Sequence, residues 1–294
     1  MTNQAVFLDM DGTILNEDNR VTNHTNDVIQ EVRQKGIKVF IATGRAYDEI
    51  PYLVPENFEV DGILSSNGAV GYINGKEIFK HQLPMETVCK LVDLAEQHQI
   101  YYELFPYYKN RIALKRDKTL LLSEIQTDEL GDVERNEWKS RQEALSEKIN
   151  WVDEIPEDAY SKFYFFKKYE SEIKKWEELI VPMKEELDIS ISHSTTCNLE
   201  TMPIGVNKAT AIQSTLDYLG IAEDTETFAI GDSDNDRQML EFVDNPIVMK
   251  NAPDHIKASG SEVTRRTNVE NGVADFLSQK FLIGGVSIEK RKFL

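Results

Sequence analysis

Two aspartates near the start of the chain have the type and spacing needed for chemistry. Asp9 and Asp11 stand two residues apart in the segment FLDMDGTIL, directly after the apolar run Ala5–Leu8. At the end of a strand, side chains two positions apart point the same way. Two carboxylates ~4 Å apart repel each other by roughly 4 kcal/mol at an effective dielectric constant of about 20. The pair therefore needs a cation or a shared proton to hold it.

A second group of acidic residues follows a later apolar run. The segment FAIGDSDNDRQML places Asp232 directly after a predicted strand, and Asp234, Asn235 and Asp236 lead into the following helix. Hard oxygen ligands suit Mg²⁺, which is usually held by few carboxylates together with substrate phosphate. The sequence has no cluster of histidine and cysteine that would attract zinc. The two acidic segments together therefore indicate a magnesium site.

Hydrogen-bond donors for an anion come from two further segments. Thr43 and Gly44 follow the apolar run Ile37–Ala42, and they offer a hydroxyl and an unhindered backbone amide. Lys208 stands at the predicted start of a helix, where the free amides and the helix dipole already favour an anion. Ligands for a cation beside donors for an anion indicate a Mg²⁺-assisted reaction on a phosphoryl group.

The elements that must position these residues alternate between strand and helix. Apolar runs at Ala5–Leu8, Ile37–Ala42 and Gly62–Ser65 are typical of buried strands, and Thr22–Lys35 has helical spacing. Because this alternation is typical of parallel β-α-β units, we predict an α/β fold with a doubly wound, Rossmann-like parallel sheet. Ligands of such sheets bind beyond the carboxyl ends of the strands, where the residues above stand.

The sequence pattern changes in the middle of the chain. From Pro84 the strands become aromatic and the helices strongly charged, and the first pattern returns only after Asp188. We therefore predict an inserted α+β domain over residues 84–189, between two segments, 1–83 and 190–294, that together form the core.

The composition argues against several classes of partner. The chain has 33 Lys and Arg against 51 Asp and Glu, a formal net charge of −18, which disfavours nucleic acids and anionic membranes. The sequence shows neither a membrane-spanning apolar stretch nor a signal-peptide pattern. Cys89 and Cys197 stand far apart, as free thiols of a cytoplasmic protein usually do. We therefore expect a cytoplasmic protein that binds neither nucleic acid nor membrane.

Four segments of the chain closely resemble, in order, the four signature motifs of the haloacid dehalogenase superfamily. They are DMDGT, TGR, an isolated lysine at a helix start and GDSDND. The insertion between the second and third motifs resembles the class IIB cap of its Cof-type phosphatases, and SSNGA at 65–69 adds to the match. Within this superfamily, the second aspartate, Asp11, favours phosphatase chemistry over dehalogenation.

The resemblance implies a role for each matched residue. Asp9 would attack phosphorus to form an aspartyl-phosphate, and Asp11 would protonate the leaving alcohol and later deprotonate the attacking water. Mg²⁺ would be held by Asp9, the backbone carbonyl of Asp11 and Asp232, with Asp236 orienting these ligands. The groups that would bind the phosphoryl oxygens are the Met10 amide, Thr43, Gly44, Lys208 and Asn235.

These roles predict a Mg²⁺-dependent phosphatase for monoesters of small phosphorylated metabolites, sugar phosphates first among them. A phosphotransferase or phosphomutase is an alternative, and so is a regulatory protein that binds a phospho-ligand without turnover. Arg45 and Asn251 are further candidates for substrate contact, and Arg45 could equally form a surface ion pair. Lys250 stands where the superfamily often has glycine, and we expect it to lie in solvent. The segment 284–294 extends beyond the pattern and receives no role.

Overall fold

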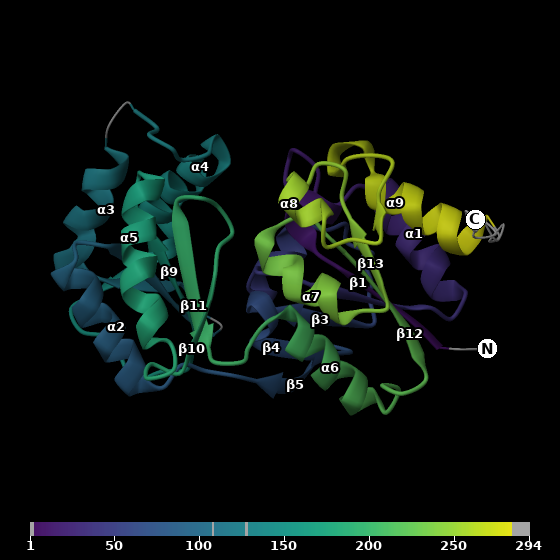
Figure 1. The fold of residues 1–294 in the computed structure, drawn as a ribbon, viewed down its shortest axis with the longest axis horizontal. Helices are drawn as coiled ribbons and strands as arrows, with labels where there is room; N and C mark the ends of the chain where they lie inside the picture. Colours follow the sequence, from purple (N-terminus) through teal and green to yellow (C-terminus); the bar gives the residue numbers. More distant parts are fainter. Residues whose placement is uncertain (1–2, 108, 127–128, 284–294) are drawn as a thin grey trace, which may run out of the picture.

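The structure is a computed structural model of the 294-residue chain, and it describes residues 3–107, 109–126 and 129–283. Within these residues the strands form two sheets, one of eight strands and one of six, and each sheet lies in its own lobe (Figure 1). The larger sheet takes its strands from both ends of the described chain, and the smaller one from the middle. The segment 284–294 lies outside the described residues.

The larger sheet has the strand order β14-β13-β12-β1-β2-β3-β4-β5. The strands from β14 to β3 run parallel, whereas β4 and β5 form an antiparallel hairpin at the edge. The hairpin turns at Asn74 and Gly75, which both have the positive φ that a tight two-residue turn requires. The strands are β1 Asn3–Leu8, β2 Lys38–Ala42, β3 Gly62–Ser65, β4 Val70–Ile73, β5 Lys76–Lys80, β12 Thr225–Gly231, β13 Asn245–Val248 and β14 Glu262–Val263.

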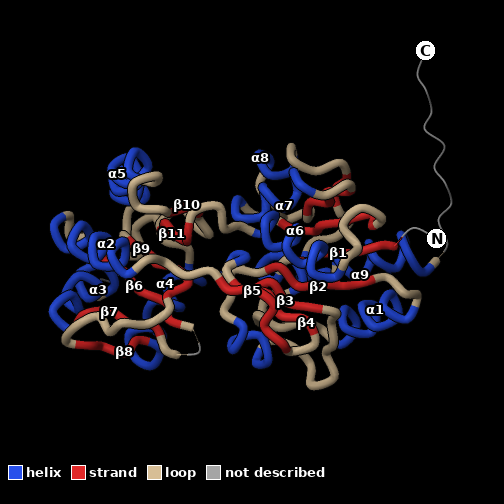
Figure 2. Tube along the Cα trace, turned by 90° about the horizontal axis from the view of Figure 1, so that it is seen from below, coloured by secondary structure: helices blue, strands red, loops and turns tan. Residues whose placement is uncertain are grey.

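Helices cover both faces of this sheet, so the predicted doubly wound α/β fold is confirmed. Helices α1 (Asn23–Gln34) and α9 (Gly272–Leu277) pack on one face. Helices α6 (Lys208–Leu219), α7 (Arg237–Phe242) and α8 (Asp254–Lys257) pack on the other. Figure 2 shows α6 and α7 on one side of the sheet and α1 on the opposite side. Alternate residues of β1 enter the two apolar layers, because successive side chains of a strand point to opposite faces.

The smaller sheet has the order β10-β11-β9-β6-β7-β8, with antiparallel pairing except between β7 and β8. One face packs on α2 (Met85–Gln97) and α5 (Glu170–Ile180), and α3 (Lys118–Ile125) and α4 (Arg135–Glu143) lie against part of the other. The strands are β6 Tyr101–Pro106, β7 Arg111–Leu114, β8 Ile149–Val152, β9 Tyr160–Phe166, β10 Ile189–Ser192 and β11 Asn198–Pro203.

One detail differs from the sequence predictions. The smaller sheet runs to Pro203, past the expected boundary at residue 190, because β10 and β11 form a hairpin that pairs with β9. Helix α5 ends at Ile180, and Pro182, which has no backbone N–H to donate, follows its end. Among the described helices, none combines the length and apolar character that crossing a membrane requires.

Candidate active site

Three carboxylates meet at the carboxyl ends of β1 and β12, two neighbouring strands of the larger sheet. Asp9 follows β1 and Asp232 follows β12, which pairs with β1 in parallel register, and Asp236 lies one turn further on. One ligand atom from each of the three side chains lies within 4.8 Å of the other two. Asp9 and Asp236 are buried and Asp232 is partly buried. The parallel pairing of β1 with β12 thus brings together two segments more than 220 residues apart. 

Lys208 is the positive charge inside this cluster. Its fully buried Nζ lies 2.6 Å from Oδ1 of Asp9 and 2.6 Å from Oδ1 of Asp236. Burial alone would lower the pKa of Lys208, but the charges of Asp236 and Asp9 outweigh burial and raise it. Lys208 is the first residue of α6, whose start is capped by the side chain of Asn207 accepting from the Thr210 amide. The lysine is therefore fixed in place and stays protonated.

One lysine does not neutralise three carboxylates, and burial together with the remaining negative charge raises the pKa values of two of them. Burial, followed by the charge of Asp236, raises the pKa of Asp9 to about 7. Burial, followed by the charge of Asp9, raises the pKa of Asp232 to about 8. A cluster of oxygen ligands with more negative than positive charge fits a hard divalent cation, which would let these carboxyls ionise together. The three aspartates can therefore hold a metal ion.

Asp236 acts within the cluster as a brace for its neighbours. Besides its contact with Lys208, its Oδ2 accepts hydrogen bonds from the backbone amides of Asp232 at 2.9 Å and Ser233 at 3.1 Å. These bonds fix the loop that carries Asp232 against α6 and β12. The orienting role that the resemblance implies for Asp236 stays a prediction.

The loop after Asp9 is shaped by Gly12. This residue has a φ of +71°, and a Cβ atom there would lie 2.1 Å from Oδ2 of Asp232. Thr13 donates from its hydroxyl to Oδ1 of Asp232 at 3.2 Å. Asn251, a candidate for substrate contact, donates to the Gly12 carbonyl at 2.8 Å and accepts from the Asn268 amide at 3.0 Å. In this structure Asn251 braces the loop.

Asp11 lies outside the three-carboxylate cluster, and Arg45 holds it. The guanidinium donates from Nε to Oδ2 of Asp11 at 2.8 Å and from Nη2 to Oδ1 at 2.6 Å. Burial alone would lower the pKa of Arg45, but the hydrogen bond to Asp11 and the negative charges of Asp11, Glu49 and Asp9 together outweigh burial and raise it. Arg45 thus pairs with Asp11, and it also lines the cavity described below.

Asn67 links predicted phosphate-binding residues that follow two different strands. Its side-chain oxygen accepts from Nδ2 of Asn235 at 3.2 Å, and a Cβ atom on Gly44 would lie 3.0 Å from that same oxygen. Its backbone amide donates to the Thr43 carbonyl at 2.9 Å. Thr43 is fully buried, as is Met10 between the two aspartates. The SSNGA motif contains Asn67, but sequence reasoning assigned this residue no role.

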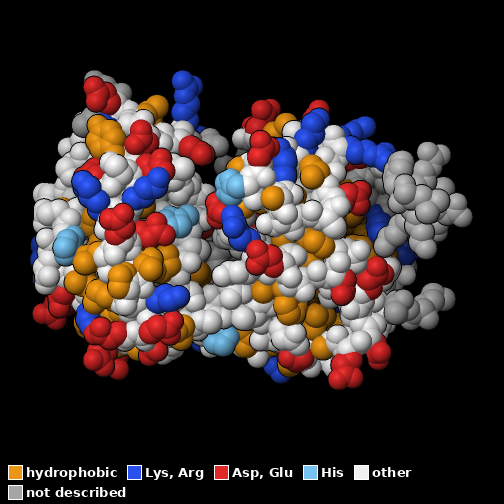
Figure 3. All heavy atoms as spheres, viewed as in Figure 1, with side chains coloured by type: hydrophobic (Ala, Val, Ile, Leu, Met, Phe, Trp, Pro, Cys, Tyr) orange, Lys and Arg blue, Asp and Glu red, His pale blue; other side chains and the backbone are white. Residues whose placement is uncertain are grey.

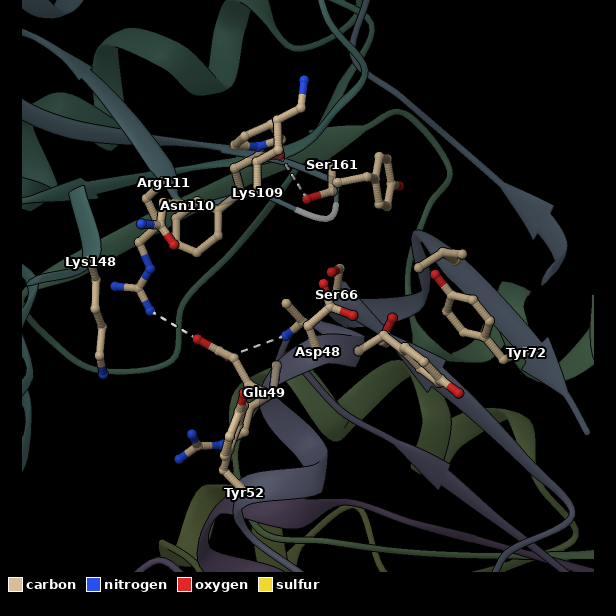
Figure 4. A pocket seen from close by; sticks show the side chains of 18 of the residues that line it. Asp48, Glu49, Tyr52, Ser66, Tyr72, Lys109, Asn110, Arg111, Lys148 and Ser161 are labelled. Atoms are coloured by element: carbon tan, nitrogen blue, oxygen red, sulfur yellow. Dashed lines mark hydrogen bonds and ion pairs between the residues drawn. The ribbon is translucent and has the colours of Figure 1, made fainter. Parts of the chain in front are cut away.

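A cavity of about 520 Å³ opens between the core loops and the second lobe (Figure 4). Figure 3 shows the surface hollowed between the two lobes. The rings of Tyr47 and Tyr72 stack in the cavity wall at 3.9 Å, and Arg111 reaches across to Glu49 at 3.3 Å. Because Arg45 lines the cavity and contacts Asp11, the cavity adjoins the predicted acid-base residue. The aromatic residues that line it are Tyr47, Tyr52, Tyr72, Phe105 and Tyr107.

Lys250 and Asp234 lie outside the carboxylate cluster. Lys250 is about half exposed, as expected, with its Nζ 4.0 Å from Glu270. Asp234 is also about half exposed and pairs with Arg237 at 3.0 Å and His255 at 3.1 Å.

Comparison with known proteins gives a consistent result over nearly the whole chain. The sequence model of the haloacid dehalogenase-like hydrolase family matches residues 6–277. The chain is 26% identical over 285 residues to 5-amino-6-(5-phospho-D-ribitylamino)uracil phosphatase YwtE of Bacillus subtilis, covering 94% of this chain and 97% of that protein.

Two solved structures have a similar fold. A haloacid dehalogenase-like hydrolase from B. subtilis superposes with a TM-score of 0.77 at 22% identity, covering 94% of this chain and 99% of that one. The subclass IIB sugar phosphatase BT4131 superposes with a TM-score of 0.66 at 22% identity, covering 94% and 98%.

Proposed function

Because the chain belongs to the haloacid dehalogenase-like hydrolase family, we propose that it is a Mg²⁺-dependent phosphatase of small phosphate monoesters. The observation that carries the proposal is the buried cluster of Asp9, Asp232 and Asp236 around Lys208. In this cluster the carboxylate of Asp9, the proposed nucleophile, lies beside the buried charge of Lys208 and beside two further carboxylates. An anionic nucleophile can approach an anionic phosphate only where such charges offset their repulsion.

Asp9 is the nucleophile of the proposed reaction. One of its carboxylate oxygens attacks phosphorus, and the bond between phosphorus and the alcohol oxygen breaks to leave an aspartyl-phosphate. Water then attacks the same phosphorus, the bond to Asp9 breaks, and inorganic phosphate leaves. Lys208 holds Asp9 in position through Oδ1 in this structure. Covalent catalysis of this kind divides one difficult step into two easier ones.

Asp11 is the proposed acid and base of the two steps. It gives a proton to the leaving alcohol in the first step and takes one from the attacking water in the second. Both of its oxygens accept from Arg45 in this structure, so Arg45 must shift before Asp11 can carry a proton to the alcohol. Since Arg45 lines the cavity, we propose that it turns from Asp11 towards the bound substrate.

The metal has a defined place in this proposal. Asp9, Asp232 and the backbone carbonyl of Asp11 would hold Mg²⁺, and Asp236 would keep Asp232 in place through the backbone bonds described above. Bound Mg²⁺ supplies positive charge to the phosphoryl oxygens. The Met10 amide, Thr43, Gly44, Lys208 and Asn235 would complete the binding of the phosphoryl group.

The substrate's alcohol part would occupy the cavity between the lobes. We propose that the lobe expected over residues 84–189, with its sheet running to Pro203, acts as a cap that selects this part. A cavity of about 520 Å³ with polar and aromatic walls suits a polyhydroxylated small molecule. Sugar and sugar-alcohol phosphates are thus the first class to test, a choice supported by the names of YwtE and BT4131.

The test is phosphate release from p-nitrophenyl phosphate and from a panel of sugar phosphates, with Mg²⁺ or with chelator. We expect release that needs both Mg²⁺ and Asp9, so that the folded variant Asp9→Asn is inactive. The exposed Asp234→Asn is the matched control, and it should retain activity. Transfer of phosphate to an added alcohol, in place of release, would instead support a phosphotransferase. Binding of phosphate esters by the folded chain without turnover on any ester would support a regulatory protein.

A further inference from the structure

A buried ion pair lies on the face of the smaller sheet that is turned towards the core lobe. Lys162 on β9 and Glu200 on the neighbouring β11 are 2.9 Å apart, and both side chains are less than a tenth exposed. Removing two charges from water costs several kcal/mol per ion, so a buried pair needs further polar partners. The partners of this pair identify its role.

Both members of the pair reach across to the core lobe. Oε2 of Glu200 accepts from Nδ2 of Asn67 at 2.9 Å, and Nζ of Lys162 donates to the Gly44 carbonyl at 3.4 Å. Gly44 follows β2 and Asn67 follows β3, so the pair contacts two adjacent core loops. These loops, with Thr43 and Asn235, form what we call the phosphate cradle.

Glu200 also fixes which way the Asn67 amide points. A carboxylate can only accept hydrogen bonds, so it holds the NH₂ group of Asn67 towards itself. The oxygen of Asn67 is then turned towards Asn235, whose Nδ2 donates to it at 3.2 Å. Asn67 in turn donates its backbone amide to the Thr43 carbonyl. Through Asn67, hydrogen bonds thus connect Glu200 of the smaller sheet to Asn235 and to Thr43 of the cradle.

We propose that Lys162 and Glu200 are positioning residues that set the phosphate cradle when the second lobe is seated on the core. The inference rests on the proposed function, since it assigns the cradle to the phosphoryl group. It adds that phosphate affinity depends on a charge in the other lobe, outside the superfamily's four signature motifs. Seating of the lobe and tight binding of phosphate are then one event, because the same bonds serve both.

The same strand offers a matched control. Lys167, at the end of β9, forms a buried ion pair with Glu124 on α3 at 2.6 Å, and Glu124 also accepts from the Lys168 amide at 2.8 Å. These contacts stay within the second lobe. Replacing Glu124 therefore removes a buried charge of similar exposure without touching the cradle.

The test compares Glu200→Gln with Glu124→Gln in the full chain. Binding of inorganic phosphate is measured by calorimetry in the presence of Mg²⁺, together with kcat and KM for p-nitrophenyl phosphate and the melting temperature. We expect Glu200→Gln to weaken phosphate binding ~10-fold, because the glutamine replaces the charge-assisted hydrogen bond from Asn67 with a weaker neutral one. Glu124→Gln should bind phosphate within about twofold of the unaltered chain, although both variants lose thermal stability.

A second readout does not depend on binding or turnover. Hydrogen exchange at residues 43–44 and 65–68 should rise in Glu200→Gln and stay unchanged in Glu124→Gln. If Glu200→Gln does not fold, Glu200→Asp replaces it in the test. Glu200→Asp keeps the negative charge and shortens the side chain by one methylene. Equal phosphate affinity in the two glutamine variants would overturn the inference, as would an unaltered chain that binds no phosphate. An unaltered chain that binds phosphate but hydrolyses no ester would overturn the proposed phosphatase while leaving the positioning role standing.

Discussion

The affinity of the site for Mg²⁺ should depend steeply on pH. The pKa of Asp232 is raised to about 8 and that of Asp9 to about 7, first by burial and then by the charges of neighbouring carboxylates. Both carboxyls must lose their protons to bind a cation, so protons compete with Mg²⁺ at neutral pH. For a group with a pKa of about 8, the ionised fraction falls ~50-fold between pH 8 and pH 6. The Asp232 proton alone should weaken Mg²⁺ binding by that factor.

The same pKa values set the pH dependence of stability without metal. The folded chain keeps protons on Asp9 and Asp232 that the unfolded chain releases near the ordinary pKa of 3.8. Stability from these groups is therefore fully present below pH 4 and is lost as pH rises through about 7 and about 8. Mg²⁺ binds the ionised form, so the increase in melting temperature on adding Mg²⁺ should be larger at pH 8 than at pH 6.

Calorimetric titration with Mg²⁺ at pH 6, 7 and 8 tests this, in two buffers of different ionisation enthalpy. The buffers together give the number of protons released per metal bound, which should exceed zero at pH 6 and 7. Asp232→Asn should bind Mg²⁺ weakly and with a flatter pH dependence, whereas the exposed Asp234→Asn should follow the unaltered chain. Equal Mg²⁺ affinity at pH 6 and 8, with no proton release, would refute the reasoning.

Three substitutions test other parts of the site. Lys208→Met should lower the free energy of unfolding, measured in denaturant, by about 3–5 kcal/mol, because it leaves the buried carboxylates of Asp9 and Asp236 without their positive partner. A loss below about 1 kcal/mol would contradict this expectation. Gly12→Ala should lower the melting temperature and abolish Mg²⁺ binding, since its Cβ would lie 2.1 Å from Asp232 and its φ is +71°. Undiminished Mg²⁺ binding by that variant would show that the loop can move away. Arg45→Ala should change stability by less than about 1 kcal/mol, as the pair with Asp11 is partly exposed, yet lower kcat/KM for the best sugar phosphate. Unchanged kcat/KM would remove Arg45 from the substrate site.

The sequence alone predicted the elements that local patterns define. The strand that ends at Leu8 and the strand that ends at Gly231 are continuous apolar runs followed by aspartates, and the two pair as expected of a parallel sheet. Since the carboxyl ends of parallel strands lie at one edge, the meeting of Asp9 with Asp232 followed from that pattern. The start of α6 at Lys208 was likewise predictable, because its asparagine cap precedes it.

Contacts between lobes could not be predicted in this way. Glu200 and Lys162 lie on strands whose residues are buried on both faces, so alternation does not reveal which side chains face the core. Glu200 contacts Asn67 across 133 positions of sequence, and only the tertiary fold sets that pairing. The smaller sheet extends past the expected boundary at 190 for a related reason, since a hairpin strand of the second lobe and a returning core strand have the same local pattern.

The central claim is that Asp9 becomes phosphorylated during turnover. The direct measurement is rapid acid quenching of the chain with Mg²⁺ and p-nitrophenyl phosphate, followed by borohydride reduction and mass spectrometry of the peptides. Borohydride reduces an aspartyl-phosphate but leaves a free carboxylate unchanged, so reduction should occur at Asp9 alone and be absent in Asp9→Asn. Reduction at another aspartate would contradict the account. So would the absence of any reduced residue in enzyme that was turning over when it was quenched.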